Sequence, residues 1–218
     1  MTDITNLWNF TLCQGSTDHP RNGACLYDAA NWIIYGTVGD DPPSACPVIR
    51  AFAFRLNDML PDDERQRLRM FILRVIDNRD PAREPDRAKY LVERVADEIV
   101  PMARKAARQA KNKDRDAGTF AKAAADQIAA AKAARAKAAG GDADWQDVAD
   151  YVANAVEAAT KAVSNKRTRK RVYDAAIEIL DGALKIGKRA DPFDEDAVLR
   201  AVAMFERAKL EDEPVGIA

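Results

Sequence analysis

The sequence predicts an all-α protein in which an N-terminal helical module precedes an antiparallel helical bundle. Apolar residues recur at intervals of three and four through most of the chain after residue 24, which is the spacing of one buried helix face. The 218 residues include 47% hydrophobic side chains, enough to form a core. Short joints expected at 164–167 and 189–193 favour antiparallel neighbours. We therefore expect two parts, a Cys- and His-containing module over 1–80 and an Ala-rich bundle over 81–218.

The N-terminal module begins with a stretch that lacks a regular period. Residues 1–24 are rich in turn formers and predict an ordered loop with one short strand at most. A helix is predicted over 24–35, and Gly36 suits the left-handed position that often follows a helix. Ser44 as the cap and Pro47 as the first helical residue predict a second helix. The apolar stripe of that helix consists of Val48, Ile49, Phe52, Ala53, Leu56 and Met59.

A third helix and a longer fourth helix follow. Acidic residues after Pro61 suit the first turn of a helix, because they complement its dipole. The residues of the third helix expected to face the core are Leu68, Phe71, Ile72 and Val75. After a break at 77–81, the next helix is predicted over 86–110, with a kink at Pro101.

The remaining helices belong to the predicted bundle. Residues 103–139 are dominated by Ala with interspersed Lys and Arg, a composition of high helix propensity with little bulky surface to bury. Gly140 and Gly141 end this helix, and Asp142 or Asp144 caps the next one. The seam of that next helix consists of Trp145, Val148, Val152, Val156, Ala159 and Val163.

Two final helices are predicted over 168–188 and 194–210. Their inward residues are expected to be Val172, Ala176, Ile179, Leu180 and Leu184 in the first, and Val198, Leu199, Val202 and Phe205 in the second.

Charge and hydropathy limit the cellular compartment and the kinds of partner that we expect for this protein. The 34 basic and 35 acidic side chains give a formal net charge of -1, so attraction to nucleic acid or membrane would need a local patch. No apolar stretch approaches the roughly 20 residues that span a bilayer, and the N-terminus lacks the basic start of a signal peptide. We therefore expect a cytoplasmic protein with reduced cysteines and no membrane partner.

The single His and all three Cys lie within the first 46 residues, as Cys13, His19, Cys25 and Cys46. Their spacing, Cys-x5-His-x5-Cys-x20-Cys, matches none of the tight patterns of zinc sites. The favoured interpretation is small buried thiols without a cofactor, because free Cys is among the most often buried residues. The alternatives are a structural zinc ion held by all four side chains and a Cys25 nucleophile with His19 as its base.

A basic run opens the helix predicted after residue 164. It could contact the phosphates of a nucleic acid, but no interleaved aromatic residues, Gly-rich phosphate loop or helix-turn-helix pattern accompanies it. The favoured interpretation is a solvated turn whose cations pair with Asp174, Glu178 and Asp181 on the same helix. The cations of the run are Lys166, Arg167, Arg169, Lys170 and Arg171.

Several segments resemble an uncharacterised family of bacterial and phage proteins that carry a Cys-Leu-Met-Glu-Ala segment. The similar segments are Gly23–Ala30, Gly39–Pro42, Cys46–Ile49, Phe54–Asp58, the Pro-Asp-Asp turn at 61–63, the segment 89–94 and the Ala-rich tail. The family often has Asp-His-Pro before its second Cys, where this chain has Asp41-Pro42-Pro43. The resemblance implies a bacterial or phage origin, with an Ala-rich helical C-terminal region, and implies no activity.

Together these features predict a non-enzymatic intracellular protein that acts by protein–protein binding. The finer hypothesis is a phage-encoded or host-directed inhibitor or regulator. Nucleic-acid binding through 161–171 is the alternative, and a Cys-dependent enzyme is the third hypothesis. Assembly into a homo-oligomer is compatible with all of them.

Overall fold

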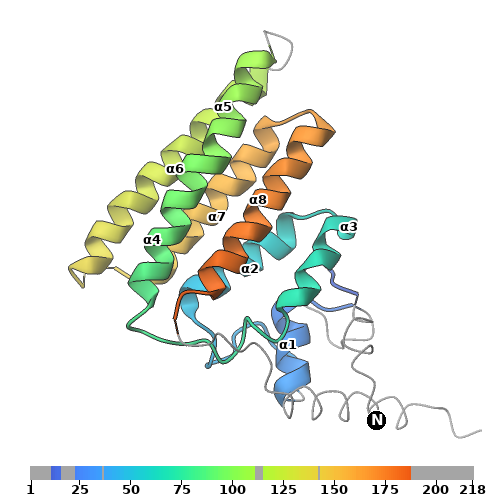
Figure 1. Ribbon diagram of the computed structural model, residues 1–218, viewed down its shortest axis with the longest axis vertical. Helices are drawn as coiled ribbons and strands as arrows, with labels where there is room; N and C mark the ends of the chain where they lie inside the picture. The colour runs from blue at the N-terminus through green and yellow to red at the C-terminus, as the bar shows by residue number, and fades with distance from the viewer. Residues whose placement is uncertain (1–10, 16–22, 36, 111–114, 142, 188–218) are drawn as a thin grey trace, which may run out of the picture.

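The computed structural model describes residues 11–15, 23–35, 37–110, 115–141 and 143–187 (Figure 1). Its helices are α1 (Leu26–Tyr35), α2 (Pro47–Met59), α3 (Asp62–Arg65), α4 (Glu84–Arg94), α5 (Val100–Gln109), α6 (Arg115–Ala139), α7 (Trp145–Ala162) and α8 (Lys166–Leu184). The all-α prediction is confirmed, because within the described ranges the only β feature is one isolated bridge. The helix predicted over 194–210 and the Gly36 position lie outside the described residues.

The isolated bridge pairs Leu12 with Ala24 in parallel orientation. The amide of Cys13 donates to the carbonyl of Ala24 at 3.0 Å, and the amide of Ala24 donates to Thr11 at 3.1 Å. The Gln66 side chain holds the same segment from the other side, because it accepts from the Leu12 amide at 2.9 Å and donates to the Leu12 carbonyl at 2.8 Å. These bonds fix the start of α1 against the chain that follows α3.

The start of α2 differs from the sequence prediction. Cys46, rather than Ser44, occupies the position before the helix, and its amide donates to the Asn78 side chain at 2.7 Å. The Ser44 hydroxyl instead lies 2.7 Å from the Tyr35 hydroxyl and accepts from the Asp77 amide at 3.4 Å. A Ser cap was expected from local propensity, but partners distant in sequence use the Ser44 hydroxyl to join two loops.

The third helix is much shorter than expected. α3 ends at Arg65 and continues as a 3₁₀ turn over Gln66–Phe71, although the residues predicted to face the core, Leu68, Phe71, Ile72 and Val75, are all buried. Buried Arg65 donates to the carbonyls of Asn57 at 2.7 Å and Leu60 at 2.6 Å, which lie at the end of α2. Arg65 therefore satisfies α2 carbonyls that have no partner within the helix.

A kink was predicted at Pro101, but the structure has a π-helical turn just before this residue. The residues Val95–Ile99 form this turn between α4 and α5, and the amide of Val100 bonds back to the carbonyl of Val95. Pro101 has no amide hydrogen, and its ring would clash with a carbonyl four residues earlier in a regular helix. The wider turn keeps α4 and α5 in one continuous rod (Figure 1).

The rod of α4 and α5 lies alongside α6, α7 and α8, and each of these helices runs opposite to the one before it (Figure 1). We call α4 to α8 the bundle. Asp144 caps α7 by accepting from the Gln146 amide at 2.9 Å, and Asn165 caps α8 by accepting from the Thr168 amide at 3.1 Å. The predicted seam residues of α7 and α8 are buried, except that Trp145 and Leu184 are half-buried.

A single cluster of buried side chains extends from Leu12 to Ala183. The helix α2 packs against α7, α8 and α4, so the described residues before and after position 80 share one core. The buried face of α6 consists mainly of Ala side chains, which allow α6 and α7 to pack along their length. None of the described helices is long and apolar enough to cross a membrane.

Candidate functional site

The structure places the three Cys residues in or near the core. Cys25 and Cys46 are buried, Cys13 is half-buried, and all three are free thiols. His19 lies outside the described residues. Within the described ranges no group of three or more His, Cys, Asp or Glu side chains could hold a metal ion. Zinc binding by the four residues stays a prediction.

Cys25 acts in the structure as a helix cap. Its sulfur accepts a hydrogen bond from the Asp28 amide at 3.3 Å, in the first turn of α1. Burial raises the pKa of the Cys25 thiol, although a helix N-terminus ordinarily favours a thiolate. Desolvation outweighs the hydrogen bonds from the backbone amides, which disfavours Cys25 as a nucleophile at neutral pH.

The interior beside Cys25 also contains polar groups. The Tyr27 hydroxyl is completely buried and has no hydrogen-bond partner among the residues that the structure describes, and burial raises the pKa of this phenol. Asp28 is equally buried, so α1 carries polar side chains into the core rather than toward solvent. The side chains of Cys25, Tyr27 and Asp28 are therefore not accessible to a macromolecular partner.

The basic run at the start of α8 divides into two kinds of side chain. Arg169 donates from Nε and Nη2 to the Val163 carbonyl, at 3.0 and 2.9 Å, and thereby closes the end of α7. Lys170 lies 3.1 Å from a Glu64 oxygen and 3.3 Å from an Asp174 oxygen. Arg169 and Lys170 therefore bond to groups of the protein itself.

Lys170 belongs to a network that joins α8 to the chain around α3. Arg67 contacts Glu64 at 2.7 Å and Asp174 at 2.6 Å, so two acids and two bases alternate. Burial disfavours the charged form of Asp174, but hydrogen bonds from Arg67 and Lys170 outweigh it and hold the pKa of this carboxyl below its usual value. The expected pairing between the basic run and Asp174 is present, together with a partner, Glu64, that local sequence does not indicate. The expected pairing with Asp181 is wrong, because Asp181 pairs with Arg74 and Lys185.

The other cations of the run face solvent. Lys166, Arg167 and Arg171 are exposed, and none forms an ion pair with a residue that the structure describes. They contribute nothing visible to the packing of α8 and remain available to a partner.

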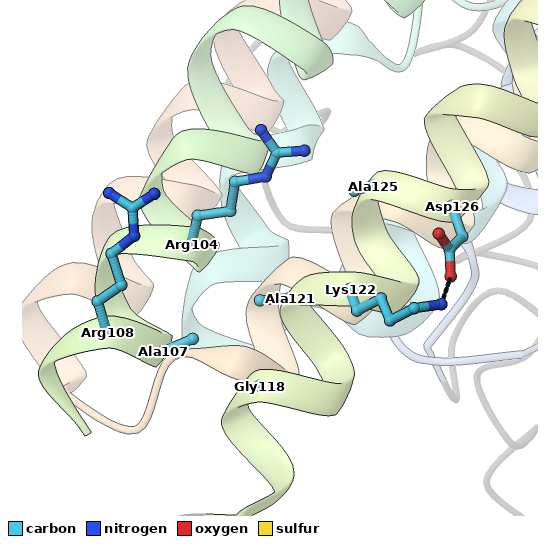
Figure 2. Close-up of a pocket in the computed structure, with 8 residues that line it drawn as sticks. All are labelled: Arg104, Ala107, Arg108, Gly118, Ala121, Lys122, Ala125 and Asp126. Atoms are coloured by element: carbon cyan, nitrogen blue, oxygen red, sulfur yellow. Dashed lines mark hydrogen bonds and ion pairs between the residues drawn. The ribbon is translucent and has the colours of Figure 1, made fainter. Parts of the chain in front are cut away.

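An open groove lies between α5 and α6, with a volume of about 440 Å³. Figure 2 shows Arg104 and Arg108 extending from α5 on one side, while Lys122 on α6 pairs with Asp126 at 2.7 Å. Small side chains form the floor between them. The lining residues are Arg104, Ala107, Arg108, Gly118, Ala121, Lys122, Ala125 and Asp126.

The groove and the basic run lie at the same end of the bundle. Figure 1 shows that α5 ends and α6 begins where α7 ends and α8 begins. Exposed cations without an ion pair to any described residue lie on α5 before the first of these turns and on α8 after the second, and we call this set the basic end. It consists of Arg104, Lys105, Arg108, Lys166, Arg167 and Arg171.

Sequence reasoning identified half of the basic end. The run at 166–171 is contiguous, whereas Arg104, Lys105 and Arg108 stood out only as part of an Ala-rich composition. Their spacing of three and four residues on one helix was the available signal.

Comparisons with protein-family models, curated proteins and solved structures found no match to this chain. Function is therefore inferred from these residues alone.

Proposed function

We propose that this protein is a non-catalytic binding protein whose basic end binds an acidic surface of a protein partner. The observation that carries the proposal is the gathering of six exposed, unpaired cations from two separate turns at one end of the bundle, counted over the described residues. The chain as a whole is nearly neutral, so this end is a local charge patch rather than part of a general field.

The difference between the paired and the unpaired cations of the basic run supports a binding role. Arg169 and Lys170 bond to the protein itself, which leaves α8 firmly positioned. Lys166, Arg167 and Arg171 project from this fixed helix without a partner in the described part of the chain. Cations held on a rigid scaffold lose less conformational entropy on binding than cations on a loop.

Nucleic acid is the second candidate partner. The same six cations could neutralise several phosphates at once, which would give binding with a steep salt dependence. No aromatic side chain lines the groove between α5 and α6, so the base stacking that usually supports single-strand binding has no platform there. This observation favours protein over nucleic acid.

The proposal is tested by capturing partners from an extract of the source organism. The variant Lys166→Gln, Arg167→Gln, Arg171→Gln should lose the partner that the wild type retains, because attraction to acidic groups disappears. The matched control neutralises three exposed cations elsewhere, Arg55, Lys132 and Lys137. Partners are identified by mass spectrometry, and their affinity is measured by calorimetry at two salt concentrations.

Equal retention by both variants would contradict the assignment of the basic end. Retention of DNA or RNA alone, lost in the same variant, would favour the second candidate. The finer proposal, a phage-encoded or host-directed regulator, rests on the family resemblance and is tested by the genes that neighbour this one. Light scattering distinguishes a second copy of this chain from a different partner.

A further inference from the structure

We infer that the groove between α5 and α6 receives an acidic amphipathic helix of the protein partner. The inference rests on the proposed function and names the element of the partner that binds. It concerns the groove shown in Figure 2.

The floor of the groove is built for close approach of another helix. Ala107 on α5 faces Gly118, Ala121 and Ala125 on α6, and none of these side chains extends beyond Cβ. A Cβ placed on Gly118 would meet nothing within 4 Å, so the groove is open at that position. Small residues at helix contacts let backbones approach closely, and burying their apolar surface favours association.

The rim of the groove supplies charge on one side. Arg104 and Arg108 are four residues apart on α5, which places them on neighbouring turns of one helix face. Both are exposed and unpaired among the described residues, whereas Lys122 is already paired with Asp126. A helix with carboxylates four residues apart along one edge matches this spacing, and arginine can bond a carboxylate through two parallel N–H groups.

A helix fits these features better than a nucleic acid does. The Ala and Gly floor carries no side-chain donor for a phosphate or a base edge, and no aromatic lining residue could stack on a base. An amphipathic helix uses both parts of the groove, because its apolar face covers the floor while its acidic edge meets the rim.

The probe is a synthetic, fluorescently labelled helical peptide of about 20 residues, with Ala and Leu on one face and Glu at intervals of four residues along one edge. Fluorescence anisotropy should show salt-dependent binding to the full chain. The variants Gly118→Leu and Arg104→Gln, Arg108→Gln should each weaken binding by about tenfold or more, because one fills the floor and the other removes the rim charge. Ala133→Leu, on an exposed position of α6 outside the groove, should leave binding unchanged.

The variants also separate this inference from the proposed function. If Gly118→Leu binds the peptide as tightly as wild type, the groove is not the peptide-binding site. This conclusion would hold even if the variant Lys166→Gln, Arg167→Gln, Arg171→Gln loses its captured partner. Absence of peptide binding at low salt would overturn the inference in the same way. Tighter binding of a single-stranded oligonucleotide, abolished by Gly118→Leu, would replace the helix with a nucleic acid.

Discussion

Single residues decide how closely the helices of this protein approach each other. Gly182 on α8 lies directly against the Tyr90 side chain of α4, and a Cβ at position 182 would overlap the Tyr90 ring and hydroxyl. Glycine ordinarily weakens a helix, so its presence near the end of α8 is explained by this contact. A side chain at position 182 would therefore have to displace the Tyr90 ring.

We expect Gly182→Ala to lower the free energy of unfolding by on the order of 1–3 kcal/mol, because the new methyl group overpacks the contact with Tyr90. In a Tyr90→Ala background the same change should instead raise it by about 0.5–1 kcal/mol, since only the higher helix propensity of Ala remains. Urea denaturation of the four proteins measures both values. Stabilisation of equal size in both backgrounds would show that the contact does not restrict position 182.

The reactivity of the three thiols tests whether the core around Cys25 is accessible to solvent. Burial raises the pKa of Cys25 and of Cys13, but only Cys13 is partly exposed. We expect iodoacetamide at pH 8 to modify Cys13 in the native protein well before Cys25 and Cys46, as followed by mass spectrometry. In urea all three should react at similar rates.

Rapid modification of Cys25 in the folded protein would restore the hypothesis of a Cys25 nucleophile. Zinc analysis of the same sample tests the metal hypothesis for Cys13, His19, Cys25 and Cys46. One tightly held zinc ion per chain, lost on Cys25→Ser, would favour the structural zinc site over buried thiols.

At the scale of single elements, α6 shows how an Ala-rich helix can be both structural and accessible. Its buried face packs on α7, and its opposite side carries Lys and Ala exposed to solvent. Gly118 interrupts the run of good helix formers near the start of α6 without any neighbour that would require a glycine. Its place on the floor of the groove is the feature that distinguishes it from Gly182.

We expect Gly118→Ala to raise the free energy of unfolding by about 0.5–1 kcal/mol, because alanine has the higher helix propensity and the added methyl group meets no atom. Thermal and urea unfolding followed by circular dichroism measure the change. A loss of stability would mean that position 118 is occupied by neighbouring side chains, which would also count against the groove as a binding site.

At the scale of the whole molecule, ion pairs join segments that are about half the chain apart. Arg74 contacts Asp181 at 2.6 Å, and Arg67 contacts Asp174 at the same distance, so two points along α8 are tied to the chain after α2. Burial disfavours the charged form of Asp181, but hydrogen bonds from Lys185 and Arg74 outweigh it and lower the pKa of this carboxyl.

This lowered pKa predicts the sign of a pH dependence. The carboxyl of an unfolded Asp titrates at about pH 3.9. The contribution of Asp181 to the free energy of unfolding is therefore fully present above that pH and is lost as the pH falls through the lower folded-state pKa. We expect Asp181→Asn to reduce the free energy of unfolding at pH 7 by about 1 kcal/mol or less. The difference from wild type should shrink as the pH falls below about 4.

Urea unfolding at several pH values measures this difference. Asp63→Asn is the matched control, because Asp63 is exposed and forms no ion pair with a described residue. A gap between Asp181→Asn and wild type that stays constant from neutral to acidic pH would show that the carboxyl is not stabilised by Arg74 and Lys185.

The sequence by itself determined most of the described helices and the faces that they bury. The apolar period of α2, α7 and α8 predicted their buried residues, and Asp144 is one of the two caps that local chemistry offered for α7. Local rules suffice for these features, because a helix repeats every few residues and its caps are formed by neighbours in sequence.

Only the tertiary structure decided the features that need partners from distant parts of the chain. Ser44 does not cap α2 as predicted, because its hydroxyl bonds to Tyr35 and Asp77. The third helix is shorter than predicted and ends at buried Arg65, whose side chain bonds to the end of α2. The basic end likewise arises because the direction of each helix brings two turns that are remote in sequence to the same end of the bundle. Periodicity specifies the buried face of one helix, but not which turns of other helices will lie beside it.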